Sequence, residues 1–223
     1  MDLILGVSSQ EINKQAEEIN LVLKKAEYTC ACCGIQSQPN PEGELLIQKR
    51  GFLYLVVDDK GKEKVVCTLC HYAMNMDKIS EPRFIYYPWL SQEQLNYYLH
   101  YLYTVFHFGT VASLAKRAST CVLQLNFFST HLNKLDPTLV KQPMKLVLLL
   151  SWLQMEDPKN YLARDDKYLR GVRLIPFPIP LKEDDIKAAF NYYGTLLHEE
   201  DMEDKWQAIY RKHVKTRKQG LAK

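Results

Sequence analysis

Four of the six cysteines form two Cys-x-x-Cys pairs, which is the spacing of a metal site. Each pair allows two thiolates to converge on one ion, and two pairs complete the tetrahedral sulfur shell that Zn²⁺ favours. The alternative, two redox-active dithiols, is disfavoured because no βαβ pattern surrounds either pair. We therefore predict a single zinc ion with four ligands, which are Cys30, Cys33, Cys67 and Cys70.

The predicted zinc ion is structural. A shell of four thiolates leaves no position for water or substrate. Structural zinc contributes folding free energy on the order of 10 kcal/mol, which would keep a small unit with little core ordered. Cys32 and Cys121 match no ligand pattern and are interpreted as small buried side chains. His71, which follows the second pair, is expected either to donate to the zinc ligands or to face solvent.

Two elements are expected to position the cysteine pairs. The segment from Glu44 to Val57 is rich in β-forming residues and is closed by the turn-forming run 58–61, so it predicts an antiparallel hairpin. The segment from Leu69 to Met76 is predicted to begin a short helix, whose free amides and dipole favour thiolates in the second pair. A cysteine pair, a hairpin and a Cys-x-x-Cys-His helix follow the order of a treble-clef or HNH-nuclease-like module.

Helix-start signals are found on both sides of this module. Ser8 and Glu11 match a capping box and predict a helix over 8–26. Ser91 with Gln94 matches another, and two Asp-Pro pairs at 136–137 and 157–158 each offer an N-cap acid followed by proline. The predicted helices of the body are 91–117, 118–133, 137–156, 158–170, 182–193 and 203–214, with Pro143 kinking the third or marking its start.

The predicted fold class is α+β, with the small zinc module embedded in a mainly α-helical body. The expected units are an N-terminal helix in 1–27, the four-cysteine module in 28–80 and the helical body in 81–223. Within the body, prolines at every second position make 171–181 an extended segment that cannot be a central strand. A basic tail ends the chain.

Two apolar runs bear on the choice between a membrane protein and a soluble one. Residues 94–115 carry no charged side chain, but polar residues at spacings of three or four form a stripe that begins with Asn96 and His100. We therefore predict an amphipathic helix buried in protein rather than a membrane span. The run from Leu146 to Leu153 is too short to span and is predicted to be a core helix. The N-terminus lacks the basic start and long apolar run of a secretory signal, so a cytoplasmic location is expected.

Composition and charge exclude several classes of protein. The chain has 223 residues, of which 47% are apolar and 25% charged, and this balance is not that of a disordered or low-complexity chain. The net charge of +3 hides a basic end, because residues 205–223 carry seven Lys or Arg and no acid. Between Cys30 and Cys70 the five basic residues are cancelled by five acidic ones. Binding of nucleic acid by the zinc module is therefore not supported.

A nuclease of the HNH type is the enzymatic alternative. Such nucleases need a histidine on the hairpin to activate water, yet no histidine lies between Gly34 and Val66. His71 and Asn75 could be remnants of the helix residues that hold a catalytic metal. Without a base and a second ion, the sequence offers no catalytic residues, and none is predicted.

The sequence resembles the IcmJ/DotN family of Dot/Icm (type IVB) secretion systems. The resemblance rests on the two cysteine pairs with His71 after the second, and on the proline-led run into a helix from Tyr87 to Asn96. A later Arg-Leu-x-Pro stretch begins at Arg173. The match runs over about residues 28–180, and the Pro-x-x-Ser-Gln-x-x-Leu-Asn run is its most specific part.

The resemblance implies a non-catalytic zinc protein that acts as an adaptor. It would be a subunit of the coupling complex, together with other coupling-complex subunits, and would hold the C-terminal tail of the coupling ATPase DotL, which delivers effector proteins. It would be cytoplasmic, and peripheral at the inner membrane only through its partner. Many relatives keep a histidine-rich stretch between the cysteine pairs, and its absence here weakens an inherited nuclease role.

Tyrosines cluster just after the zinc module, and two interpretations of them stay open. They could form helix core with hydroxyls at its wet edge, or line a groove for a partner segment, whose path the prolines of 172–181 would help to shape. The tyrosines concerned are Tyr86, Tyr87, Tyr97, Tyr98, Tyr101 and Tyr103.

Overall fold

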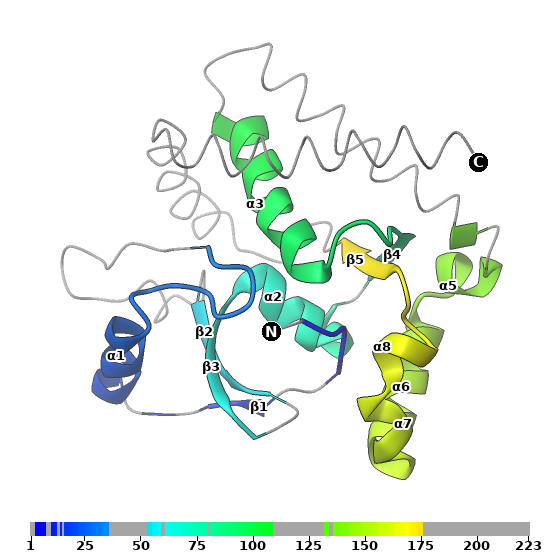
Figure 1. Cartoon of the computed structure of the whole chain (residues 1–223), viewed down its shortest axis with the longest axis horizontal. Coiled ribbons are helices and arrows are strands. Elements are labelled where there is room, and N and C mark those ends of the chain that lie inside the picture. Colours follow the sequence, from blue (N-terminus) through cyan, green and yellow to red (C-terminus); the bar gives the residue numbers. More distant parts are fainter. Residues whose placement is uncertain are drawn as a thin grey trace.

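The computed structural model describes residues 3–7, 10–12, 14, 16–35, 53–58, 61–79, 81–108, 132–133 and 136–175. In these residues the fold is mixed helix and strand, with two small antiparallel sheets and helices on either side (Figure 1). The predicted mixture of helices with small antiparallel sheets is therefore confirmed. Helices 182–193 and 203–214, the basic tail and Cys121 lie outside the described residues.

The first sheet contains the hairpin that joins the two cysteine pairs. Strands β1 (Gln10–Glu11), β2 (Leu53–Val57) and β3 (Glu63–Cys67) pair antiparallel in that order. The turn between β2 and β3 is tightened by the Asp58 carboxylate, which accepts the Lys62 amide at 2.9 Å. We expected the turn at 58–61 to follow a hairpin formed within 44–57. Instead, this turn joins the two strands of the hairpin, β2 before it and β3 after it. Residues 44–52 lie outside the described part.

The N-terminal helix is shorter than predicted. Helix α1 covers Ala16–Lys25, and the expected start near Ser8 is wrong because Gln10 and Glu11 form strand β1 beside Val56 and Val57. Pairing with a sheet edge satisfies the backbone groups of this segment, and that tertiary contact overrides the local capping signal.

The short helix after the second cysteine pair is confirmed. Helix α2 covers Thr68–Met74 with Cys67 at its N-cap, and a 3₁₀ turn, η2, follows at Met76–Lys78. Next comes a strand that we did not predict, β4 (Arg83–Tyr86), which pairs antiparallel with β5 (Val172–Ile175). The predicted extended segment is confirmed for β5, and 176–181 lies outside the described residues.

The long helix of the body begins where its capping box places it. Helix α3 covers Gln92–Phe108. The Gln94 amide donates to Ser91 Oγ and the Ser91 amide donates to Gln94 Oε1, both at 3.3 Å, which confirms the capping box. Residues 109–117 lie outside the described part, as does most of the predicted helix 118–133, of which Leu132 and Asn133 are described and helical. In the part of the chain described, no helix has both the length and the apolar character needed to cross a membrane.

Four helices follow, and prolines mark the starts of the first three. They are α5 (Pro137–Lys141), α6 (Met144–Glu156), α7 (Pro158–Leu162) and α8 (Arg164–Lys167). Asp136 and Asp157 cap α5 and α7 through their carboxylates, as predicted, and Pro143 marks the start of α6. The single helix expected over 158–170 is wrong, because it is divided at Ala163.

One continuous core joins the zinc module to the helical body. The extended segment 3–7 lies between them and is bonded to both. Gly6 accepts the Met76 amide and donates to Ala73, each at 2.9 Å, while the Arg164 guanidinium donates to the Leu5 carbonyl at 2.7 Å. The predicted units at 28–80 and 81–223 therefore share a core in the described residues.

The two segments of the body that carry the family resemblance lie against each other. The Tyr87 amide donates to the Gly171 carbonyl and Arg173 Nε donates to the Leu90 carbonyl, both at 2.7 Å. Gly171 has a φ of +74°, and a Cβ there would lie 2.7 Å from Tyr86 Cε2. Glycine is therefore required at this junction both by backbone conformation and by space.

Candidate metal centre

The four predicted ligands converge on one point. The Sγ atoms of Cys30, Cys33, Cys67 and Cys70 all lie within 4.8 Å of one another. The Cys33 and Cys67 sulfurs are 3.6 Å apart, close to the spacing of about 3.8 Å that Zn–S bonds of 2.3 Å produce in a tetrahedron. The four cysteines are therefore positioned to bind a metal ion, and the all-sulfur donor set is compatible with one zinc.

Local hydrogen bonds position both cysteine pairs. In the first, the Gly34 amide donates to the Cys30 carbonyl at 2.9 Å, and Gly34 adopts a positive φ that closes the turn. The Ala31 amide donates to Val65 of β3 at 2.8 Å and ties this turn to the hairpin. The second pair spans the junction of β3 and α2, where the Cys67 amide donates to Cys30 Sγ at 3.2 Å.

Burial and hydrogen bonds act in opposite directions on the four cysteines. Cys30, Cys67 and Cys70 are fully buried. Burial raises the pKa of Cys33 and of Cys70 well above the usual value for a thiol. Although burial opposes it, hydrogen bonds from neighbouring cysteines lower the pKa of Cys30 and bring that of Cys67 to about 7. A divalent cation would favour the thiolate form of all four, because it compensates the charge of buried thiolates.

Cys32 lies beside the cluster but does not belong to the four cysteines whose sulfurs lie within 4.8 Å of one another. Its pKa is raised to about 12, first by its hydrogen bond to Cys30 and then by burial and the neighbouring charges. The interpretation of Cys32 as a bystander, half-buried against the core, agrees with this geometry.

Helix α3 supplies two polar side chains to the cysteine sulfurs, and we did not predict this contact. Asn96 Nδ2 donates to Cys70 Sγ at 3.3 Å, and His100 Nε2 lies 3.2 Å from Cys67 Sγ. Both side chains are buried, Asn96 completely. Donors to sulfur spread the negative charge that four thiolates around one divalent ion retain. The polar stripe of α3 was the feature of the sequence that could have revealed this contact, because polar side chains that become buried need hydrogen-bond partners.

Gln92 extends this network to the second sheet. Its Nε2 donates to Asn96 Oδ1 at 2.8 Å and to the Leu174 carbonyl at 2.9 Å, and its Oε1 accepts the Leu174 amide at 2.9 Å. A hydrogen-bonded path therefore runs from strand β5 through Gln92 and Asn96 to a cysteine of the cluster. Sequence reasoning missed Gln92, because its partner is distant along the chain.

The helix residues expected in a nuclease are engaged in packing. His71 is buried, which corrects the expectation that it could face solvent, and its ring stacks on Tyr54 with centroids 4.1 Å apart. Asn75 Nδ2 lies 3.3 Å from His71 Nδ1 and donates to the His71 carbonyl at 2.8 Å. Among the described residues, the four cysteines are the only cluster of side chains suited to hold an ion.

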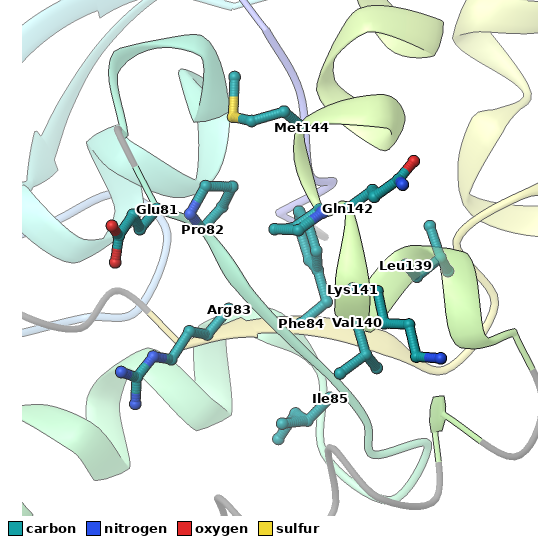
Figure 2. Close-up of a pocket in the computed structure, with 11 residues that line it drawn as sticks. Glu81, Pro82, Arg83, Phe84, Ile85, Leu139, Val140, Lys141, Gln142 and Met144 are labelled. Carbon is teal, nitrogen blue, oxygen red and sulfur yellow. The ribbon is translucent and has the colours of Figure 1, made fainter.

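A cavity of about 690 Å³ lies away from the cysteines, beside β4. Figure 2 shows its two walls, with the strand on one side and the corner between α5 and α6 on the other. Apolar side chains such as Phe84, Val140 and Met144 line it, with the charged Arg83 and Lys141 among them. Within the described residues, β4 pairs with β5 and with no other strand.

The comparisons with known proteins assign no family. No protein-family model matches the chain, and no curated protein matches it.

Proposed function

We propose that this chain is a non-catalytic zinc-binding adaptor of a type IVB (Dot/Icm) secretion coupling complex. In this role it holds the C-terminal tail of the coupling ATPase DotL and supports the delivery of effector proteins. The observation that carries the proposal is the convergence of four cysteines on one point. A shell saturated by four thiolates stabilises a fold and leaves no position for a reacting molecule.

The surroundings of the cysteines support a structural role. His71 and Asn75 are hydrogen-bonded to each other and buried, so neither is placed to activate water. Asn96 and His100 point their nitrogens at sulfur, which is the task of side chains that hold metal ligands in place. These contacts favour the adaptor over the HNH-type nuclease.

The cavity beside β4 is the surface that we assign to the tail. An extended peptide can bind next to a strand by main-chain hydrogen bonds while its side chains enter neighbouring pockets. β4 offers the strand, and the α5–α6 corner offers an apolar wall with Lys141 exposed on it. Attachment through the tail would place the protein at the cytoplasmic face of the inner membrane, with other coupling-complex subunits as neighbours.

A binding titration of the zinc-loaded chain with the isolated DotL tail tests this proposal. We expect a one-to-one complex that Lys141→Glu weakens, because the lysine lies on the cavity wall. Lys159→Glu, an exposed lysine of α7 outside the cavity lining, is the matched control and should bind as the wild type does. A folded, zinc-loaded protein that does not bind the tail would remove the main support for the adaptor.

Incubation with plasmid DNA separates the adaptor from the nuclease and from a nucleic-acid-binding module. With Mg²⁺, Mn²⁺ or Ni²⁺ present, we expect intact plasmid and no shift in its mobility. Cleavage that is lost in His71→Ala would favour the nuclease. A salt-sensitive mobility shift without cleavage would instead favour nucleic-acid binding.

A further inference from the structure

Helix α6 is apolar on both of its faces. Its inner face packs into the core through Leu146, Val147, Leu150 and Leu153, all of which are buried. Its outer face presents four large apolar side chains to solvent. These are Leu148, Leu149, Trp152 and Met155, with exposed fractions of 65%, 40%, 53% and 71%, and we call them the outer α6 face.

The expectation of a core helix over 146–153 is confirmed for the inner face of α6, but the outer α6 face is exposed. A single exposed leucine, such as Leu21 on α1, is ordinary on a protein surface. A contiguous apolar stripe on one helix is not, because a helix that is apolar all round is normally covered on all sides. Figure 1 shows α6 among α5, α7 and α8 on the side of the molecule away from α1.

Two opposite charges frame the outer α6 face. Lys145 lies at the start of α6 and Glu156 at its end, and both side chains are exposed. They are eleven positions apart, which is about three helical turns, so both lie on the same side of the helix as Trp152. The apolar stripe thus has a positive end and a negative end.

This pattern is complementary to itself when reversed. If a second α6 packs antiparallel across a two-fold axis at Leu150 and Ser151, Lys145 of each copy lies opposite Glu156 of the other. The same operation sets the Leu148 and Leu149 side chains against Trp152 of the second copy. Identical surfaces related by a two-fold axis form a closed pair.

We propose that the outer α6 face is a homodimer interface, in which two copies of this chain pack their α6 helices antiparallel. Trp152 lies near its centre, where an aromatic side chain that loses its water contributes most to binding. The proposal is independent of the partner assigned above, because it uses a different surface from the cavity beside β4.

Sedimentation velocity of the full, zinc-loaded chain tests the interface. We expect a concentration-dependent dimer that Trp152→Glu converts to monomer. Leu21→Glu, which places the same charge at another exposed apolar position, should leave the dimer unchanged. Zinc content and circular dichroism show that each variant is folded. A wild-type chain that stays monomeric at its highest soluble concentration, or a dimer insensitive to Trp152→Glu, overturns the proposal.

A charge exchange tests the antiparallel arrangement. Lys145→Glu alone creates two like-charge contacts in the dimer, and so does Glu156→Lys, so each should raise the dissociation constant about tenfold at low salt. The double variant Lys145→Glu with Glu156→Lys restores both pairs and should return the constant to the wild-type value. Failure of the double variant to recover overturns the proposed pairing.

Discussion

The side-chain amide of Asn96 donates a hydrogen bond to the sulfur of Cys70 across 3.3 Å. Helix α3 therefore contacts the cysteine cluster through a buried polar side chain. Its buried polar residues hold the sulfurs on one side and the backbone of β5 on the other. Because of this arrangement, we expect loss of the metal to destabilise helix α3 and strand β5 as well as the hairpin.

Asn96→Leu and His100→Phe should each weaken zinc binding by about 10- to 100-fold, because each removes a donor to a ligand sulfur. Competition with a chromophoric chelator measures the affinity. Asn160→Leu makes the same change as Asn96→Leu at a helix cap of α7 and should leave the affinity as it is. If Asn96→Leu binds zinc as tightly as the control, the contact to Cys70 has no role in holding the metal.

Gln92→Leu should loosen β5 while leaving the four ligands in place. The variant loses the side chain that both donates to and accepts from Leu174. Hydrogen exchange of the Leu174 amide should then become faster, as it should in the wild type after zinc is removed. Gln154→Leu on α6 provides the control. Unchanged exchange at Leu174 in Gln92→Leu would argue against a path from the cluster to β5.

Cys67→Ser and Cys70→Ser should lose the metal and much of their stability. A structural zinc ion contributes on the order of 10 kcal/mol, so the metal-free protein should melt at a lower temperature and expose its hairpin. Cys32→Ser is the matched control, and we expect it to keep one ion and the wild-type melting temperature. Full folding of the metal-free variants would contradict a structural role for the ion.

Gly171→Ala should destabilise the zinc-loaded protein by about 2–4 kcal/mol, from a left-handed backbone and from overlap with the Tyr86 ring. Gly61 has the same φ of +74° but open space around it. Gly61→Ala should therefore lower the free energy of unfolding by only about 1–2 kcal/mol, which is the cost of placing alanine in the left-handed backbone conformation. Denaturant unfolding measures both changes, and equal losses would mean that the contact with Tyr86 carries no cost.

Local chemistry made the helix starts and the ligands predictable. The capping box at Ser91 and the Asp-Pro starts of α5 and α7 depend on residues within four positions of one another. The two Cys-x-x-Cys pairs are equally local, and their spacing predicted the four cysteines whose sulfurs the fold brings within 4.8 Å of one another. In each case the interacting groups are close in sequence, so no knowledge of the fold was needed.

Contacts between distant segments were not predictable in the same way. Strand β1 forms only because Gln10 and Glu11 reach β2, and β4 forms because Arg83–Tyr86 meets β5 from the other end of the described chain. Gln92 and Leu174 are likewise 82 positions apart. The apolar composition of α6 predicted that the helix is buried. It did not distinguish the face that packs into the core from the face that is exposed.

X-ray absorption at the zinc edge of the purified protein identifies the atoms bound to the metal. We expect one zinc per chain with four sulfur neighbours at about 2.3 Å and no nitrogen or oxygen bound to the ion. The spectrum of His100→Phe should show the same four sulfurs. A nitrogen neighbour that disappears in His100→Phe would make His100 a ligand, and that result, or a protein without zinc, would contradict the four-cysteine structural site.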